Sequence, residues 1–543
     1  MKRFLAIGIA VSAISAQAIT FPKDDQAIVH VLNRVAFGPA PGDVEKVRAM
    51  GLQRYLDEQL RPERIADPAM ASRLGGLTTT RMSSHEIFQQ YEVPQLQARA
   101  AKKQNAKGNA DGQDQASKMP PDPVQQRANS VVAELAEQKV LRAVYSERQL
   151  QEVLTDFWFN HFNIDARKGR DKFLLTEYER DTIRPRVLGK FRDLLGATAK
   201  SPAMLFYLDN WMSADPNGPH PTLTQGRMVR GPFGGRTYLP PTAKPAAQGK
   251  NAPKGLNENY GRELMELHTL GVDGGYTQKD VTEVARAFTG WTIEPPRQGI
   301  GFKFEPRIHD NGQKVVLGHV IKAGGGESDG EEVLDILARQ PATAHFISTL
   351  LVRRFVSDTP PPALVDRAAA RFHDTDGDLR EVMRTILTSP EFLSPDAYRA
   401  KVKTPFEFVV SALRATGADV AEARVLVREL QQLGMPLYQC QPPTGYKDTG
   451  DAWVNTGALV SRMNFALRLS NNQVPRVTVV SLQSSVFGPA AGGSGQGEVD
   501  ADAAIAQLLS GNASDSTRAT IAKATTAPQM AALTLGSPEF QRR

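Results

Sequence analysis

The sequence predicts a mainly α protein, a large multi-helix body with a small β-hairpin and long loops. Apolar residues recur at helical spacing through most of the 543 residues. One strong hairpin signal occurs, the Asn-Gly pair at 311–312, with Phe302 and Phe304 on one side and residues 315–317 on the other. Glycine (44 residues) and proline (36 residues) gather between the helical segments, which predicts long loops.

The predicted organisation follows from shifts in composition along the chain. It comprises a signal peptide (1–18), an N-terminal helical part (19–98), a flexible low-complexity insertion (99–127), a main helical domain with a hairpin near 302–317 (128–470), a linker (471–500) and a C-terminal helical segment (501–543). Helices are expected at 27–37, 43–60, 131–164 (one long helix or two), 172–195, 259–270, 278–289, 331–355, 363–372, 379–387, 399–416, 422–433 and 454–469. Residues 212–256, rich in Gly, Pro and Asn, are expected to form a long loop that could cover a cleft.

The N-terminus is typical of a secretory signal. Lys2 and Arg3 precede an apolar stretch, and residues 16–18 form an A-x-A cleavage site. We therefore expect an exported protein, periplasmic or extracellular, with an N-terminal anchor as the alternative. No later run reaches the eighteen or so apolar residues of a membrane helix, so no transmembrane segment is expected after cleavage.

Composition excludes several classes of protein. Hydrophobic residues make up 41% and charged residues 23%, which excludes a disordered chain and a collagen. The net charge of +6 is too small to indicate a nucleic-acid partner, so none is expected. The single cysteine, Cys440, excludes an internal disulfide and CxxC-type sites, and we expect it to be a packed small residue.

The first candidate motif is residues 156–163, which contains His161. On a helix, Phe157, Trp158 and His161 share one apolar face, so this histidine should be buried. It could be a core histidine bonded to a backbone carbonyl, and the alternatives are a metal ligand or a general base.

The second candidate motif is residues 257–271. Glu263 and Glu266 lie about 60° apart on an ideal helix, whereas Glu266 and His268 lie about 160° apart and cannot easily bind one ion. Arg262 and Glu266 form an i,i+4 pair that could be a simple salt bridge. Polar groups in an apolar frame cost free energy unless they are paired or functional, so a structural network and an active site both remain open.

Two loops contain further candidates. His309 and Asp310 stand at the expected hairpin tip, where an exposed histidine could reach a metal or a substrate, although turn chemistry alone explains Asp310. Residues 374–378 begin like a calcium loop but lack its required Gly and Glu, which favours Asp378 as a helix N-cap. No GxSxG elbow, P-loop, dinucleotide fingerprint or HExxH pattern is present.

Several longer motifs stand in order along the chain, at 30–39, 157–162, 257–271, 288–291, 309–310, 389–392 and 401–405. In these the sequence resembles the bacterial family called domain of unknown function 1800, from about residue 26 onwards. The resemblance implies an exported, mostly helical protein with no assigned reaction. It also implies a partner, because genes of this family commonly neighbour those of domain of unknown function 1501, an exported family similar to alkaline-phosphatase-like sulfatases.

Two hypotheses follow. The first is an exported enzyme, metal-assisted or acid–base, that acts on an extracellular or envelope polymer. Its proposed catalytic residues are His161, Arg262, Glu263, Glu266 and His268, and a divalent metal, if it is the cofactor, would bind His161, His309 and Asp310. The second is a non-catalytic helical scaffold or binding module that works with an exported partner, in which the same motifs form a buried polar network. Convergence of these side chains on one solvent-reachable cavity would favour the enzyme, and their dispersal or burial would favour the module.

Overall fold

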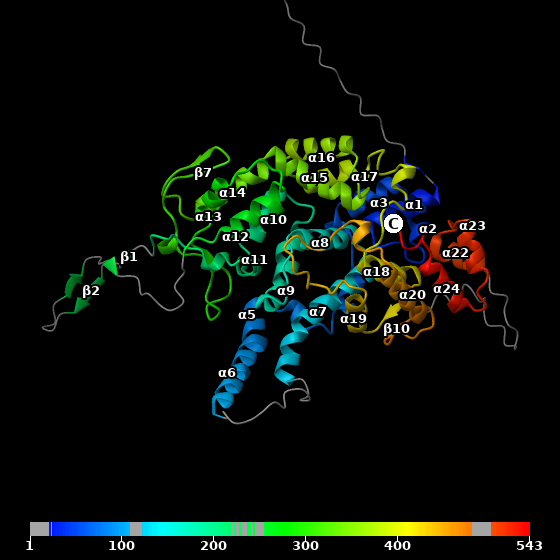
Figure 1. Ribbon diagram of the computed structural model, residues 1–543, viewed down its shortest axis with the longest axis horizontal. Helices are drawn as coiled ribbons and strands as arrows, with labels where there is room; N and C mark the ends of the chain where they lie inside the picture. Colours follow the sequence, from blue (N-terminus) through cyan, green and yellow to red (C-terminus); the bar gives the residue numbers. More distant parts are fainter. Residues whose placement is uncertain are drawn as a thin grey trace, which may run out of the picture.

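The computed structural model describes residues 21–22, 24–108, 122–218, 222–223, 227–230, 236–239, 243–244, 255–479 and 501–543. Helices dominate, and the strands of this part form only short two-stranded antiparallel sheets, so the predicted mainly α class is confirmed (Figure 1). One hydrophobic cluster extends from Ile28 to Phe540. The predicted signal peptide lies outside the described residues.

The N-terminal helices are α1 (Asp25–Val35), α2 (Asp43–Met50), α3 (Leu52–Gln59), α4 (Pro68–Arg73) and α5 (Ser84–Ile87). The predicted single helix at 43–60 is wrong, because Gly51 separates α2 from α3. Its φ of 85° is a left-handed value that a helix interior does not allow. The beginning of α1 is fixed by Asp24, whose carboxylate accepts a hydrogen bond from the backbone N–H of Ala27 at 2.8 Å.

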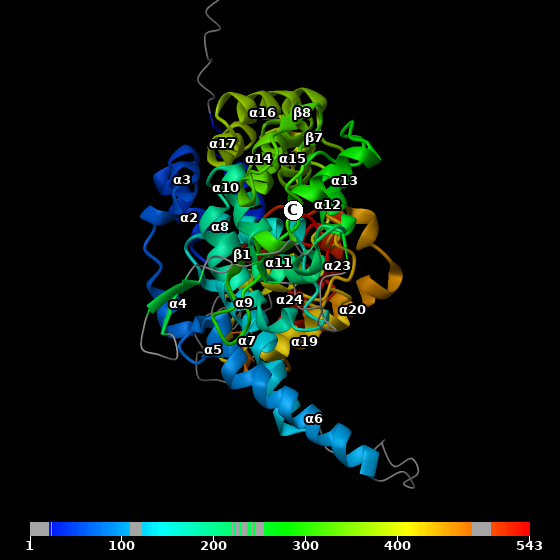
Figure 2. The same cartoon turned by 90° about the vertical axis from the view of Figure 1, so that its left-hand side faces the viewer.

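Two helices border the predicted insertion, α6 (Val93–Gly108) and α7 (Pro123–Tyr145). Residues 99–108 and 123–127 of the predicted insertion are helical. Residues 109–121 lie outside the described part of the chain. Figure 2 shows α6 extending away from the helical body.

The middle of the chain contains α8 (Gln149–His161), α9 (Leu175–Glu177), α10 (Phe191–Ala199), α11 (Pro202–Tyr207), α12 (Glu258–Glu263) and α13 (Gln278–Ala287). The predicted helix at 172–195 is interrupted by a π-helical turn, Tyr178–Ile183, and then by Pro185, which has no backbone N–H to donate. The motif at 257–271 also leaves regular α geometry, since α12 continues as the π-helical stretch Leu264–Thr269.

The strand pairing near residue 310 differs from the prediction. β6 (Phe302–Phe304) pairs with β5 (Trp291–Ile293), and β7 (Lys314–Val316) pairs with β8 (His319–Ile321). The small hairpin is thus β7–β8, and it turns at Leu317 and Gly318, whose φ values are 50° and 81°. Other described strands are β1 (Thr222–Leu223) with β4 (Ala243–Lys244), β2 (Arg227–Arg230) with β3 (Arg236–Leu239), and β9 (Asp419–Val420) with β10 (Val477–Thr478). The first four of these fall within the predicted long loop at 212–256, much of which lies outside the described residues.

The next helices are α14 (Glu327–Arg339), α15 (Pro341–Phe355), α16 (Pro362–Asp374), α17 (Leu379–Leu387), α18 (Pro405–Ala415) and α19 (Arg424–Gln432). The predicted helix at 331–355 is two helices, because Pro341 begins α15. The predicted N-cap is confirmed, since the Asp378 carboxylate accepts hydrogen bonds from the backbone N–H groups of Arg380 and Glu381.

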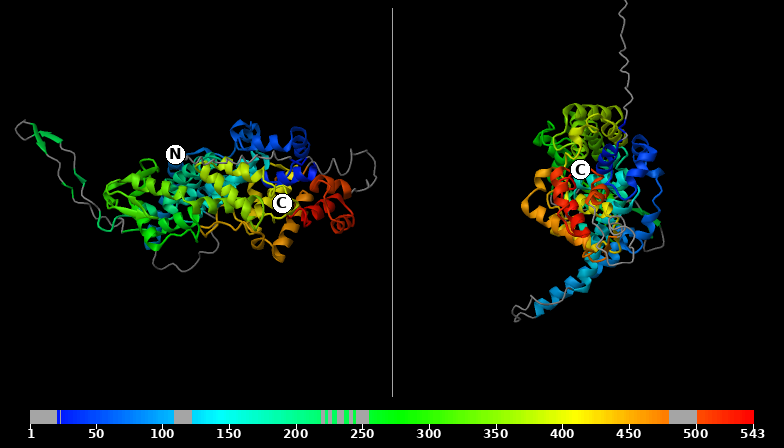
Figure 3. Two further views of the ribbon diagram at one scale, coloured as in Figure 1. Left: turned by 90° about the horizontal axis from the view of Figure 1, so that it is seen from above. Right: turned by 90° about the vertical axis from the view of Figure 1, so that its right-hand side faces the viewer.

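The C-terminal helices are α20 (Thr456–Ser470), α22 (Ala501–Leu509), α23 (Asp515–Ile521) and α24 (Ala527–Gly536). They lie at the same end of the molecule as α1 and α2 (Figures 1 and 3). A short backbone ladder fixes the last residues, in which the Lys403 N–H donates to the Gln541 carbonyl at 2.9 Å. Within the described residues, no helix has the length and apolarity needed to cross a membrane.

Candidate functional site

The motif at 156–163 forms the last turns of α8, and Asn160 ties it to a distant loop. The Asn160 side chain donates to the Tyr446 carbonyl at 2.8 Å and accepts from the Tyr446 N–H at 2.7 Å. The loop approaches so closely that a Cβ on Gly445 would lie 2.3 Å from the backbone oxygen of Asn160. Glycine is required there, and its φ of 71° is also left-handed. This asparagine therefore holds a loop in place.

Asn163 holds the same loop at a second point. Its amide donates to the Cys440 carbonyl at 2.9 Å and to the Pro442 carbonyl at 2.8 Å. Cys440 itself is buried, as predicted, and burial raises the pKa of its thiol to about 11. A thiol with such a pKa stays protonated at neutral pH and is a poor nucleophile. The motif at the end of α8 thus builds the wall formed by residues 435–449.

His161 is buried, and its Nε2 donates to the backbone carbonyl of His268 at 3.1 Å. This is the contact expected of a core histidine. Burial lowers the pKa of His161 to about 4, so the ring is neutral at physiological pH. The ring stacks on Phe157, with 6.4 Å between centroids. A neutral ring that donates from Nε2 keeps a lone pair on Nδ1.

His268 lies beside His161, with 6.2 Å between the ring centroids. Its side chain is buried, and burial lowers its pKa to about 3, with a further contribution from His161. The structure therefore brings together two of the predicted catalytic histidines, and both rings are neutral.

The other predicted catalytic residues of this motif are turned elsewhere. Arg262 donates to the Gln278 side chain at 2.7 Å, so among the described contacts the alternative salt bridge to Glu266 is not formed. Glu266 instead accepts from the Tyr276 hydroxyl at 3.3 Å. Glu263 is half-buried, and burial, followed by the nearby Glu266, raises its pKa. These groups form a partly exposed polar cluster that does not line the cavity beside His161.

The prediction that His309 is exposed on a hairpin tip is wrong, because the side chain is fully buried. Its Nδ1 bonds the Thr289 carbonyl at 2.7 Å, and its Nε2 lies 3.1 Å from Asp329 Oδ2. Lys314 binds the same Asp329 carboxylate at 2.6 Å. These residues fix the two short sheets against α14.

Asp310 also has fixed partners. Arg286 binds its carboxylate at 2.7 Å. Burial alone would raise the pKa of Asp310, but the hydrogen bonds from Arg286 and the Gly312 N–H outweigh it and lower the pKa. Among the described residues, no three His, Cys, Asp or Glu side chains are grouped as metal ligands, and His161, His309 and Asp310 form no such group.

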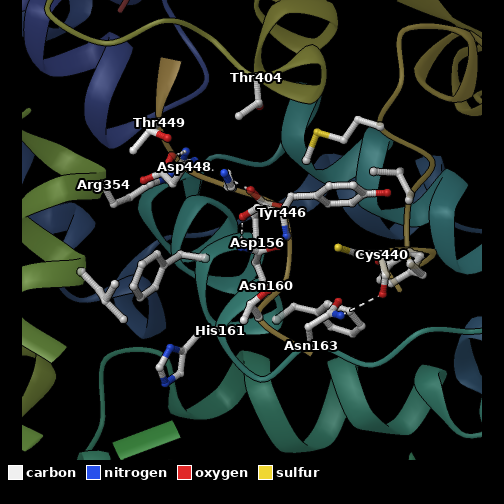
Figure 4. A pocket seen from close by; sticks show the side chains of 18 of the residues that line it. Asp156, Asn160, His161, Asn163, Arg354, Thr404, Cys440, Tyr446, Asp448 and Thr449 are labelled. Carbon is white, nitrogen blue, oxygen red and sulfur yellow. Dashed lines mark hydrogen bonds and ion pairs between the residues drawn. The ribbon is translucent and has the colours of Figure 1, made fainter. Parts of the chain in front are cut away.

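Next to Asn160 and His161 lies a partly open cavity of about 390 Å³, between α8, α15 and residues 435–449. Figure 4 shows Asp156, Asn160 and Tyr446 near its centre, whereas the ring of His161 lies at the edge of the group, turned away from Asp448. Cationic side chains on the wall outnumber carboxylates; they are Lys139, Arg353, Arg354 and Lys447, against Asp156 and Asp448.

A buried ion network lies behind the cavity. Glu407 binds Arg354 at 2.6 Å and Arg543 at 2.9 Å, and its carboxylate also caps α18. Burial would raise the pKa of Glu407, but Arg354 and Arg543 lower it to about 2. No sequence motif marks Arg353, Arg354 or Asp448 as residues of a site. Asp156 belongs to the quoted motif, and the others stand in stretches without a local signal.

The fold and the site define a helical protein with a polar, cation-rich cavity and a buried ionic frame. Residues 30–542 match the model of the family described as "Protein of unknown function (DUF1800)", and the chain belongs to this family. The resemblance noted from the motifs is thereby confirmed. No curated protein and no solved structure matches the chain.

Proposed function

We propose that this protein is an exported, non-catalytic helical binding module, and that the cavity beside Asn160 is its binding site. One observation carries the proposal. The predicted catalytic side chains do not converge on one cavity, and the polar groups of the best motif hold the loop that forms the cavity wall. A site of about 390 Å³ falls within the size range of small-ligand pockets.

Export is part of this proposal and rests on residues 1–18 of the sequence. Expression of the full chain in a bacterium should yield a protein in the periplasm or the medium that begins at Ile19. N-terminal sequencing would check this. A chain that retains residue 1 in the membrane fraction would instead support the N-terminal anchor.

The proposed partner is the exported, sulfatase-like protein of the domain of unknown function 1501 family from the same organism. Mixing the two purified mature proteins should give a complex that sediments faster than either alone. If the partner binds the loop at 435–449, Gly445→Ala should weaken that complex, because a Cβ at this position would clash with the backbone of α8 and displace the loop. Gly434→Ala is the matched control, since its φ is also positive (86°) but a Cβ there meets nothing within 4 Å. Absence of a complex with the unaltered protein would remove this partner.

The second candidate function is an enzyme, metal-assisted or acid–base, acting on an extracellular or envelope polymer. The observation in its favour is His161, a neutral imidazole on the cavity wall with Nδ1 free to accept a proton or a metal. Elemental analysis of the purified mature protein by mass spectrometry, beside His161→Ala and Glu263→Ala, tests the metal. Stoichiometric metal that is lost in folded His161→Ala protein would favour the enzyme. If both variants retain fold and function, these residues are not catalytic.

A further inference from the structure

Two cationic side chains on the wall of the cavity, Arg353 and Lys447, form no salt bridge within the described part of the chain. Arg353 stands in the last turn of α15 and lines the cavity. Its side chain has no hydrogen bond or ion pair in the described part of the chain, and its Nε is buried without a partner. Lys447, on the opposite loop, has no ion pair within 4 Å among the described residues, and its charge, after a hydrogen bond from Thr449, helps to lower the pKa of Asp451.

The two carboxylates on the wall cannot serve as partners, because each already faces two or more cations. Asp156 binds Lys139 at 2.7 Å and lies 3.7 Å from Arg354. Asp448 lies 3.3 Å from Arg354, 3.6 Å from Arg543 and 3.7 Å from Lys401. Both wall carboxylates are therefore already paired, and Arg353 and Lys447 are the wall cations that remain without an ion pair in the described part of the chain.

We infer that this cavity binds an oxyanionic group (a carboxylate, a phosphate or a sulfate) on a ligand of about one sugar or amino acid residue, held by Arg353 with Lys447. The planar guanidinium of arginine matches the two oxygens of such a group, and lysine adds a mobile point charge. Aromatic rings of Phe157, Phe159 and Tyr446 on the same wall provide apolar surface for the body of the ligand. The inference deepens the proposed function, because it names the chemistry of its ligand.

The test is isothermal titration of the full mature protein with four related sugars, glucuronate, glucose 6-sulfate, glucose 6-phosphate and uncharged glucose. Acetate, inorganic phosphate and sulfate serve as free-ion probes. At least one charged probe should bind, glucose should not, and the order of affinities identifies the oxyanion. Arg353→Gln should weaken binding at least about tenfold, because the guanidinium can donate two charge-assisted hydrogen bonds to the oxyanion, and Lys447→Gln should weaken it less, because the ammonium contributes a single mobile charge.

The matched control is Arg339→Gln. It removes the same charge from a side chain that is 67% exposed, and binding should not change. Since Arg353 loses no partner on substitution, its glutamine variant should melt at the same temperature as the unaltered protein. No binding by any charged probe, or binding that Arg353→Gln leaves unchanged, would overturn the inference. A lower melting temperature without a change in binding would show that Arg353 stabilises the C-terminal end of α15 instead, and would also overturn the inference.

This outcome is separable from that of the proposed function. The titration contains no partner protein, whereas the binding module is tested by sedimentation with the partner. Complex formation without oxyanion binding would leave the module and remove only the ligand chemistry. Oxyanion binding without a complex would keep the ligand site and remove the partner.

Discussion

Asn160→Ala tests whether the motif at the end of α8 is structural. The substitution removes both hydrogen bonds to Tyr446, at 2.8 and 2.7 Å, and leaves a part-buried N–H and carbonyl without their partner. Each lost bond costs about 1 kcal/mol net, and a stranded buried group costs about 1–3 kcal/mol. Because the loop is part-buried and water can reach some of these groups, we expect a loss of about 2–4 kcal/mol in the free energy of unfolding.

The assay is urea unfolding followed by circular dichroism, together with hydrogen exchange of residues 435–449. The loop should exchange faster in Asn160→Ala, because its two anchors to α8 at this point are gone. Asn259→Ala is the matched control. This asparagine lies in the other motif but is exposed, so its replacement should change stability by less than about 0.5 kcal/mol. Unchanged stability and unchanged exchange in Asn160→Ala would refute the structural role and return the motif to the catalytic hypothesis.

Three further substitutions address the loop, the buried histidines and the buried ion pair. Gly445→Ala places a methyl group 2.3 Å from a backbone oxygen of α8 and should cost about 2–4 kcal/mol in urea unfolding, more than Gly434→Ala. Burial lowers the pKa of His268 to about 3. Below pH 6.5 the unfolded chain therefore takes up a proton that the folded chain does not, and the free energy of unfolding decreases as the pH is lowered. His268→Leu should remove up to about 3 kcal/mol of that loss between pH 6.5 and 4, and an unchanged slope of the urea midpoint against pH would contradict this. Lys314→Met leaves the buried Asp329 carboxylate without its cationic partner and should cost about 3–5 kcal/mol in thermal unfolding. Adding Asp329→Leu should restore only part of this loss, because His309 Nε2 then loses its own partner, and no restoration at all would show that the pair is not coupled.

The predictions that proved correct depended on local chemistry. Asp378 caps α17 because its carboxylate needs only the N–H groups of Arg380 and Glu381. The lack of a basic neighbour of Cys440 in the sequence indicated a packed thiol, and the side chain is buried. The mainly α class followed from periodicity, which each helix carries in its own residues. Helix divisions were less secure. The break at Gly51 and the π-helical stretch Leu264–Thr269 depend on packing as well as on propensity.

Predictions that failed required partners distant in the sequence. The Asn-Gly pair at 311–312 indicated a hairpin, but β6 found its partner in β5, on the other side, and His309 was buried by Asp329 of α14. The site shows the same limit. The sequence pointed to the motif around Asn160, yet its partner Tyr446 lies 286 residues away, and Arg353 has no local signal.

The contacts between motifs explain how the cavity acquires its uncompensated charge. Arg354 of α15, Glu407 of α18 and Asp448 of the loop share one ionic network. Arg543 and Lys401, which do not line the cavity, add further positive charge beside Asp448. A buried network of ion pairs fixes geometry but offers little to a ligand, because displacing any member leaves another buried charge unpaired. Arg353 and Lys447 are not members of this network of ion pairs, so a ligand can pair with them without breaking an existing salt bridge. The frame and the binding surface are thus separate sets of charges, and substitutions in the first should unfold the protein whereas substitutions in the second should change only what it binds.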